Sequence, residues 1–147
     1  MKHAKLQALA IAVTLALSAG NAAAQDAAAD AMTAPQIRAS LESQGYTRVN
    51  DVEFEDGVWK ADARSADGQR VELRVDPATG KVYPEDAVST LGEADVRAKL
   101  SAAGYSKVDD VKFDDGVWTA DAEDANGRDL KLTLDPETGE VVGKDRD

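Results

Sequence analysis

The sequence predicts an α+β protein made of two tandem repeats, each with one helix packed on a three- to four-stranded antiparallel meander sheet. Three observations lead to this fold class. A shift of 59 residues superimposes two stretches without a gap, and 24 of the 46 positions from Ile37 to Val82 are then identical. Each stretch begins with apolar residues at helical spacing and continues with short apolar–polar alternations. Turn signals that contain glycine separate these alternations.

Residues 1–24 have the three parts of a secretory signal peptide. A short basic region precedes an apolar run that is too short for a comfortable membrane span, and small residues follow. Ala22 and Ala24 fit a signal peptidase site, so we expect cleavage before Gln25. A retained membrane anchor is the alternative, which the alanine-rich site disfavours. We therefore expect a bacterial protein that is periplasmic or secreted and not inserted in the membrane after cleavage.

The rest of the chain divides into two repeats and three connecting or terminal segments. A unit of 46 residues buries little surface alone, so we expect the repeats to share an interface or a continuous sheet. The predicted segments are a flexible N-terminal tail (25–32), repeat 1 (33–83), a linker (84–91), repeat 2 (92–143) and a C-terminal tail (144–147).

A helix is predicted at the start of each repeat. In repeat 1, Thr33 and Gln36 have capping-box spacing, and Ile37 and Leu41 lie one helical turn apart. Gly45 then provides a stop that can adopt a left-handed conformation.

The second helix has the same pattern, with Val96 and Leu100 as its apolar stripe. Thr90 and Glu93 repeat the capping spacing, although a start at Gly92 or Glu93 is equally consistent with the sequence.

Three alternations after each helix predict three strands, and a short fourth strand is expected at residues 81–83. Alternation of period two implies that each sheet has one apolar face and one solvated face. Trp59 and Trp118 alternate with inward-facing alanines, which favours core packing, and Tyr46 and Tyr105 are expected to cover the helix–sheet seam. The turns between the strands are predicted at Asp56-Gly57, Asp67-Gly68 and Asp76-Pro77-Ala78-Thr79-Gly80, with Asn126-Gly127 replacing the second in repeat 2.

Composition excludes several classes of function. The chain has 28 acidic and 17 basic residues, a formal net charge of −11, and loss of residues 1–24 would deepen this to −13. Nucleic-acid binding is unfavourable for such a protein, because phosphate contacts need lysine and arginine. Cysteine is absent and the one histidine, His3, lies in the expected signal peptide, so thiol and imidazole chemistry is not expected. We predict no enzymatic activity, no catalytic residue and no cofactor.

The order of these elements resembles the PepSY domain. The resemblance runs from Gly45-Tyr46 to Asp76-Pro77-Ala78-Thr79-Gly80-Lys81-Val82, and again from Gly104-Tyr105 to Asp135-Pro136-Glu137-Thr138-Gly139-Glu140-Val141. It implies a module of the kind found in propeptides of secreted metallopeptidases and in small exported bacterial proteins, where it binds or restrains proteases. A tandem α/β inhibitor of β-lactamases is similar in architecture. Because no peptidase domain follows Asp147, we expect any restraint to act on a separate exported protein.

Five residues are candidates for the partner surface. Asp62 and Asp121 occupy equivalent places in the two repeats, on the face predicted to be solvated, and Glu53 and Glu55 lie on the same face. Tyr83, beside the linker, has no aromatic counterpart in repeat 2. An acidic surface of this kind would bind a basic partner, with charge acting mainly on association rate and selectivity. The sequence leaves the partner and the oligomeric state open.

The alternative function is an envelope accessory protein that binds or senses cations through its acidic surface. A specific calcium loop of the EF-hand type needs oxygen ligands at positions 1, 3 and 5. Ala63 and Ala122 occupy the first position in the two stretches that come nearest, and hairpin turns explain both. We therefore predict no specific metal site.

Overall fold

The computed structural model describes residues 31–146 and confirms the predicted fold class. A helix and then a four-stranded antiparallel sheet occur twice, and each sheet is a meander with its strands in sequence order. Repeat 1 contains α1 (Ala34–Ser43), β1 (Thr47–Glu55), β2 (Val58–Arg64), β3 (Arg70–Val75) and β4 (Val82–Pro84). Repeat 2 contains α2 (Glu93–Ala102), β5 (Ser106–Asp114), β6 (Val117–Glu123), β7 (Asp129–Leu134) and β8 (Val141–Arg146).

In both helices, a side chain in the first turn accepts a hydrogen bond from the backbone amide of the residue before the helix. Gln36 Oε1 accepts from the Thr33 amide at 2.8 Å, as the capping spacing predicts. In repeat 2, Asp95 Oδ2 accepts from the Gly92 amide at 2.8 Å, so α2 begins directly after Gly92. The predicted start at Glu93 is confirmed, with Gly92 as the capping residue, and a start at Thr90 is wrong because the accepting carboxylate lies three residues after Gly92.

The first hairpin of each sheet closes through an Asp-Gly turn. Asp56 and Gly57 have φ values of +54° and +78°, and Asp115 and Gly116 have +48° and +78°. Positive φ at both central residues is the type I′ pattern, whose twist matches that of the flanking strands. The predicted turn is therefore confirmed in both repeats.

The edge strands β1 and β5 are irregular in the same way. Pairing with the neighbouring strand shifts twice along each of them. Arg48 and Asp51 have φ values of +51° and +48°, and the equivalent Lys107 and Asp110 have +49° and +46°. Such bulges bend a strand and leave residues out of the regular ladder. They recur at the same places in both repeats, so they belong to the architecture of the unit.

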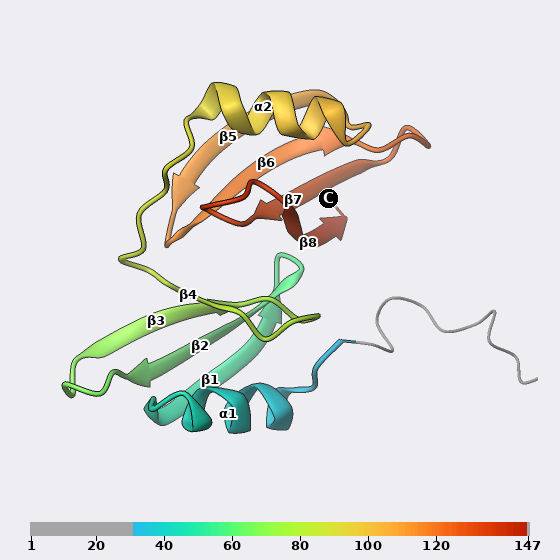
Figure 1. Cartoon of the computed structure of the whole chain (residues 1–147). Helices are drawn as coiled ribbons and strands as arrows, with labels where there is room; N and C mark the ends of the chain where they lie inside the picture. The colour runs from blue at the N-terminus through green and yellow to red at the C-terminus, as the bar shows by residue number, and fades with distance from the viewer. Residues whose placement is uncertain (1–30, 147) are drawn as a thin grey trace, which may run out of the picture.

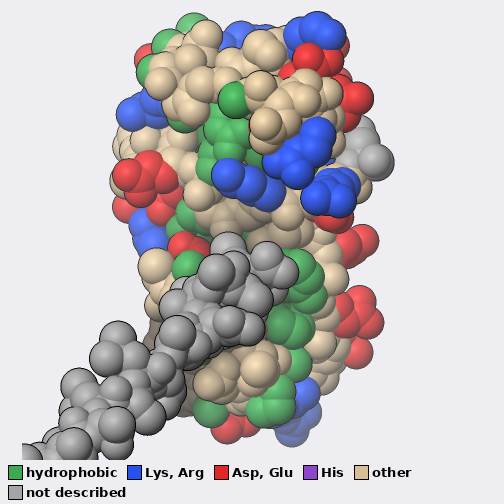
Figure 2. All heavy atoms as spheres, turned by 90° about the vertical axis from the view of Figure 1, so that its right-hand side faces the viewer, with side chains coloured by type: hydrophobic (Ala, Val, Ile, Leu, Met, Phe, Trp, Pro, Cys, Tyr) green, Lys and Arg blue, Asp and Glu red, His purple; other side chains and the backbone are tan. Residues whose placement is uncertain are grey.

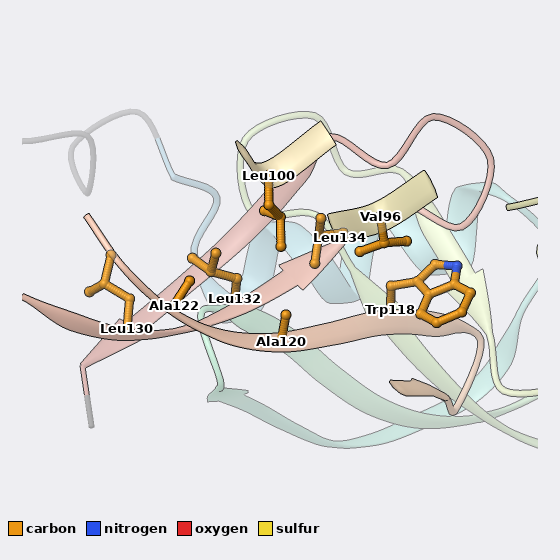
Figure 3. Packing of buried hydrophobic residues seen from close by; sticks show 8 residues of the cluster. All are labelled: Val96, Leu100, Trp118, Ala120, Ala122, Leu130, Leu132 and Leu134. Atoms are coloured by element: carbon orange, nitrogen blue, oxygen red, sulfur yellow. The ribbon is translucent and has the colours of Figure 1, made fainter. Parts of the chain in front are cut away.

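Each repeat has its own hydrophobic core between the helix and the sheet. In repeat 2, Val96 and Leu100 point from α2 onto the strands, and Trp118 fills one end of the layer (Figure 3). Trp118 is 7% exposed, which confirms its predicted place in the core. The small alanines of β6 let the helix lie close to the sheet. The buried cluster consists of Val96, Leu100, Trp118, Ala120, Ala122, Leu130, Leu132 and Leu134.

Four layers stack in the order α1, sheet β1–β4, sheet β5–β8 and α2 (Figure 1). The two sheets are separate, and their helix-free faces turn toward one another. Val58 and Val117 lie on these faces and are 1% and 2% exposed. The expected interface between the repeats is confirmed. The expectation that the helix-free face is solvated is wrong where the repeats meet.

The two Asp-Gly turns dock reciprocally, each on the opposite repeat. Gly57 lies against the backbone of Lys144 in β8, and Gly116 lies against the backbone of Pro84 in β4. Gly143 in β8 in turn packs against Gly57 and leaves no room for a side chain. Each repeat thus uses the same turn to contact the last strand of the other.

Two predicted boundaries differ from the structure. β8 continues to Arg146 and pairs with β7, so the expected C-terminal tail from residue 144 is mostly strand. Met32, the last residue of the expected flexible tail, is fixed at the end of repeat 1. Its amide donates to the Pro77 carbonyl at 2.8 Å, and its carbonyl accepts from the Trp59 indole N–H at 2.9 Å.

The predicted signal peptide and its cleavage residues Ala22, Ala24 and Gln25 lie outside the described residues. Within residues 31–146, no helix combines the length and apolar character needed to cross a membrane.

Residues 33–84 expressed alone should form a poorly stable fragment without a cooperative unfolding transition. The isolated repeat exposes Val58, which is 1% exposed in the full chain, and leaves the Gly57 turn without its contact on β8. Circular dichroism during thermal unfolding, compared with the full chain, measures the difference. A single repeat that melts cooperatively at the temperature of the full chain would contradict this expectation.

Candidate functional site

A polar cleft of about 220 Å³ lies where the two helix-free faces meet. The carboxylate of Asp56, in the Asp-Gly turn of repeat 1, accepts from Lys131 of repeat 2 at 3.1 Å and from Lys60 at 3.2 Å. Asp115, in the Asp-Gly turn of repeat 2, pairs with Arg74 of repeat 1 at 2.6 Å. The docked turns therefore bring one aspartate each to the third strand of the opposite repeat.

Fixed partners stabilise the charged form of Asp56. Burial alone would raise the pKa of this carboxyl, but hydrogen bonds from Lys131 and Lys60 outweigh burial and lower the pKa. The hydroxyl of Thr133, which is 1% exposed, donates to the Asp56 carbonyl at 3.1 Å. A general acid at neutral pH needs a raised pKa, so Asp56 serves as a structural anion rather than a proton donor.

We define the junction as the region where the two sheets and their Asp-Gly turns meet. Among the described carboxylates of the junction, Asp135 accepts the most hydrogen bonds. It is 4% exposed and accepts from Lys81 Nζ at 2.7 Å and from the Tyr83 hydroxyl at 2.9 Å, both in repeat 1. The amides of Glu137 and Thr138 donate to it at 2.7 and 3.0 Å. Burial would raise its pKa, but Lys81, the two amides and Tyr83 lower it to about 2. Burial, and then this neighbouring carboxylate, raise the pKa of the Tyr83 phenol.

The five candidate residues do not form one site. Asp62 in β2 pairs with Arg70 at 2.6 Å. Glu55 in β1 pairs with Lys60 at 2.6 Å, and Glu53 lies opposite Lys60 on the neighbouring strand. Glu53 and Glu55 are therefore together and exposed at one edge of repeat 1, whereas Asp62 belongs to a separate ion pair.

Two of the five candidates lie away from that edge. Asp121 is in the other sheet, opposite Lys131 across β6 and β7. Tyr83 is 3% exposed and bonded to Asp135, so its prediction as a surface contact is wrong. The residue bridges the repeats because a buried phenol needs a hydrogen-bond partner, and Asp135 provides one.

Sequence reasoning missed the charged residues of the junction. Asp56 and Asp115 are identical in the two repeats, and this identity was a signal that both act in the same way. The third-strand residues that face the docked turns differ between the repeats. For example, Glu72 in β3 of repeat 1 is the equivalent of Lys131 in β7 of repeat 2. Carboxylate oxygens of Glu72, Glu85 and Asp115 lie within 4.8 Å of one another. Asp115 already has a cation from Arg74, which partly neutralises this group.

An apolar groove of about 380 Å³ lies beside the C-terminal end of α2. Figure 2 faces this end of repeat 2 and shows hydrophobic side chains flanked by lysine and arginine side chains. Ala102 and Ala103 line the groove where repeat 1 has the polar Ser43 and Gln44. The remaining lining residues are Lys99, Leu100, Tyr105, Thr138, Gly139, Glu140 and Val141.

Comparison with known proteins identifies the repeated unit. The sequence matches the family described as peptidase propeptide and YPEB domain over residues 7–86 and again over residues 85–145. No curated protein and no solved structure was found that matches the chain. The first matched stretch contains α1 and the whole of its sheet, and the second contains α2 and all of its sheet except Arg146, the last residue of β8. Because the two matches span most of the sequence, the chain belongs to the PepSY family of peptidase propeptide and YPEB domains and carries the domain twice.

Proposed function

We propose that the chain is a non-enzymatic, exported protein-binding module that restrains another exported protein, foremost a peptidase. Family membership carries the proposal, because the domain is described from peptidase propeptides and each copy has a helix and a four-stranded sheet. The carboxylates of the junction also support a non-catalytic role. Asp56 and Asp135 are held in the charged form by fixed donors, the opposite of what acid catalysis requires.

The junction would give such a module a preformed binding surface. Reciprocal docking of the Asp-Gly turns and the ion pairs across the cleft fix the two repeats relative to one another. A rigid surface loses less conformational entropy on binding than a flexible one. The exposed Glu53 and Glu55 would then attract a basic patch of the partner to their edge of repeat 1.

Purified residues 25–147, immobilised and exposed to envelope proteins of the source bacterium, should retain an exported peptidase. The captured peptidase should hydrolyse labelled casein more slowly when the chain is added, and the association should weaken with salt. A variant with Gly116→Arg, which disrupts the docking of the repeats, is the matched control. Equal recovery on both proteins, or unchanged hydrolysis, would contradict the proposal.

Cation binding is the second candidate, favoured by the grouping of Glu72, Glu85 and Asp115. Calcium prefers carboxylate oxygens, and two of these three residues are exposed to solvent. Calorimetric titration of the full chain with calcium at physiological salt should then show a saturable signal that Glu85→Gln reduces. A flat titration would end this alternative.

A further inference from the structure

The duplication provides an internal comparison at the outer ends of the two sheets. Positions with the same residue in both repeats belong to the framework, whereas positions of opposite charge are not required by the fold. Arg64 and Arg70 of repeat 1 correspond to Glu123 and Asp129 of repeat 2. Residues 33–83 contain 7 basic and 9 acidic residues, but residues 92–143 contain 6 basic and 13 acidic ones. Repeat 1 therefore has a net charge of −2 and repeat 2 a net charge of −7, because repeat 2 carries more acidic residues.

Arg48, Arg64 and Arg70 gather around a polar depression of about 370 Å³ at the end of β1, β2 and β3. Arg64 and Arg70 are direct cross-strand partners, an arrangement of like charges that destabilises a sheet. Asp62 pairs with Arg70 at 2.6 Å, yet the Arg70 side chain remains 72% exposed. Arg64 donates to the Gly68 carbonyl at 2.7 Å, which fixes its guanidinium at the rim.

At the equivalent place in repeat 2, a lysine neutralises one member of the like-charged pair. Glu123 and Asp129 are also direct cross-strand partners, but Lys107 pairs with Glu123 at 2.5 Å. Arg48 takes the place of Lys107 in repeat 1, so it adds a third cation instead of neutralising a pair. Among the described residues, Arg48 forms no ion pair. Repeat 1 thus keeps three arginines around this depression, of which only Arg70 forms an ion pair in the described part of the chain.

This cluster lies away from the junction. The β2–β3 turn beside it and the β6–β7 turn of repeat 2 lie at opposite ends of the molecule (Figure 1). A ligand at the β2–β3 end would therefore leave the docked Asp-Gly turns undisturbed.

We propose that Arg48, Arg64 and Arg70 form a binding surface for an acidic, carboxylate-bearing segment of the partner protein. The proposal rests on the proposed function as a protein-binding module. Guanidinium groups bind carboxylates through paired hydrogen bonds, which gives geometry as well as charge. Asp51 and Asp62 flank the arginines, and the net charge of −11 repels an extended polyanion such as nucleic acid more strongly than a short acidic segment with few charges. A short acidic segment fits the small cationic cluster between them.

The test measures fluorescence anisotropy of a labelled hexaglutamate peptide titrated with the full chain at low salt. We expect saturable binding of one peptide per chain. Arg64→Glu combined with Arg70→Asp should weaken binding by about tenfold or more, because charge-assisted hydrogen bonds become repulsions. These substitutions install the residues that repeat 2 carries, so the variant should fold, which circular dichroism checks. A wild-type chain that does not bind, or a variant that binds equally well, would overturn the proposal.

The reciprocal variant, Glu123→Arg combined with Asp129→Arg, should create a second site and raise the stoichiometry to two peptides per chain. No gain of binding would refute the claim that this arginine pattern suffices. A labelled oligothymidine that binds as tightly and with the same sensitivity to Arg64→Glu and Arg70→Asp would overturn the assignment to an acidic protein segment.

The failure of this inference differs from a failure of the proposed function. If the Arg64→Glu, Arg70→Asp variant restrains the captured peptidase as well as wild type does, the arginine surface is wrong and the proposed function stands. If hexaglutamate binds but no peptidase is captured, the surface is confirmed and the proposed function fails.

Discussion

Replacing Gly116 with alanine should lower the free energy of unfolding of the full chain by about 3 kcal/mol, since backbone strain and overpacking add. Gly116 has a φ of +78°, a conformation that side chains rarely adopt. A Cβ atom there would also overlap the carbonyl oxygen of Pro84, which is backbone and cannot rotate away. Urea unfolding followed by tryptophan fluorescence measures the loss.

Gly127→Ala is the matched control for this experiment. Gly127 has a φ of +73°, but a Cβ atom there meets nothing within 4 Å. The free energy of unfolding of the control should therefore fall only by the cost of placing a side chain on a left-handed backbone, about 1 kcal/mol. The difference between the two variants isolates the docking of the turn on the opposite repeat. Equal losses would show that this docking does not stabilise the chain.

Replacing Asp135 with asparagine should lower the free energy of unfolding by about 2 kcal/mol at pH 7, because the buried carboxylate loses charge-assisted hydrogen bonds. Lys81 would lose the closer of its two carboxylates and keep Glu137 at 3.5 Å, and the buried Tyr83 hydroxyl would lose the charged acceptor 2.9 Å away. Asp76→Asn is the control. Asp76 is the equivalent residue of repeat 1, where it accepts from Ala78 and Thr79 of its own turn.

The same carboxylate makes stability depend on pH in the acidic range. The folded pKa of Asp135 is about 2, below the unfolded value of about 3.9. A group whose pKa is lowered by folding stabilises the protein above its unfolded pKa. This contribution is complete above about pH 4 and is lost as the pH falls toward 2. Urea unfolding between pH 6 and 2 should show a shallower loss for Asp135→Asn than for wild type; parallel curves would contradict this.

Features set by neighbouring residues were predictable from the sequence. The Thr33–Gln36 capping interaction spans three residues, and the Asp56-Gly57 turn depends on two residues that tolerate positive φ. Alternation around Trp59 identified the face that meets the helix. The duplication strengthened each of these inferences, since the same pattern occurred twice.

The junction was not predictable in the same way. Apolar–polar alternation identifies the polar face of a sheet but not what covers it. Such a face can be exposed to water, or it can pack against another polar face and form ion pairs with it. Asp56 and Lys131 are 75 residues apart, and no local pattern relates them. Tyr83 and Asp135 are 52 residues apart, so an aromatic residue without a counterpart looked accessible when it is buried.

The same contrast between local patterns and long-range contacts applies to the candidate partner surface. The sequence predicts a solvated position for Glu53 and Glu55, and both are exposed. It gave no sign that Arg48, Arg64 and Arg70 meet at one end of the sheet, because they lie on three different strands. Their significance follows from register, in particular from the direct pairing of Arg64 with Arg70.

The bulged edges of β1 and β5 protect the chain against fibril growth. A straight, unpaired edge is a template on which strands of other molecules can add, layer after layer. Arg48 and Asp51 in β1, and Lys107 and Asp110 in β5, turn the backbone out of line through their positive φ values. A foreign strand therefore finds no regular row of donors and acceptors on either edge. The strain held at these four residues makes the β1 and β5 edges poor templates for an added strand.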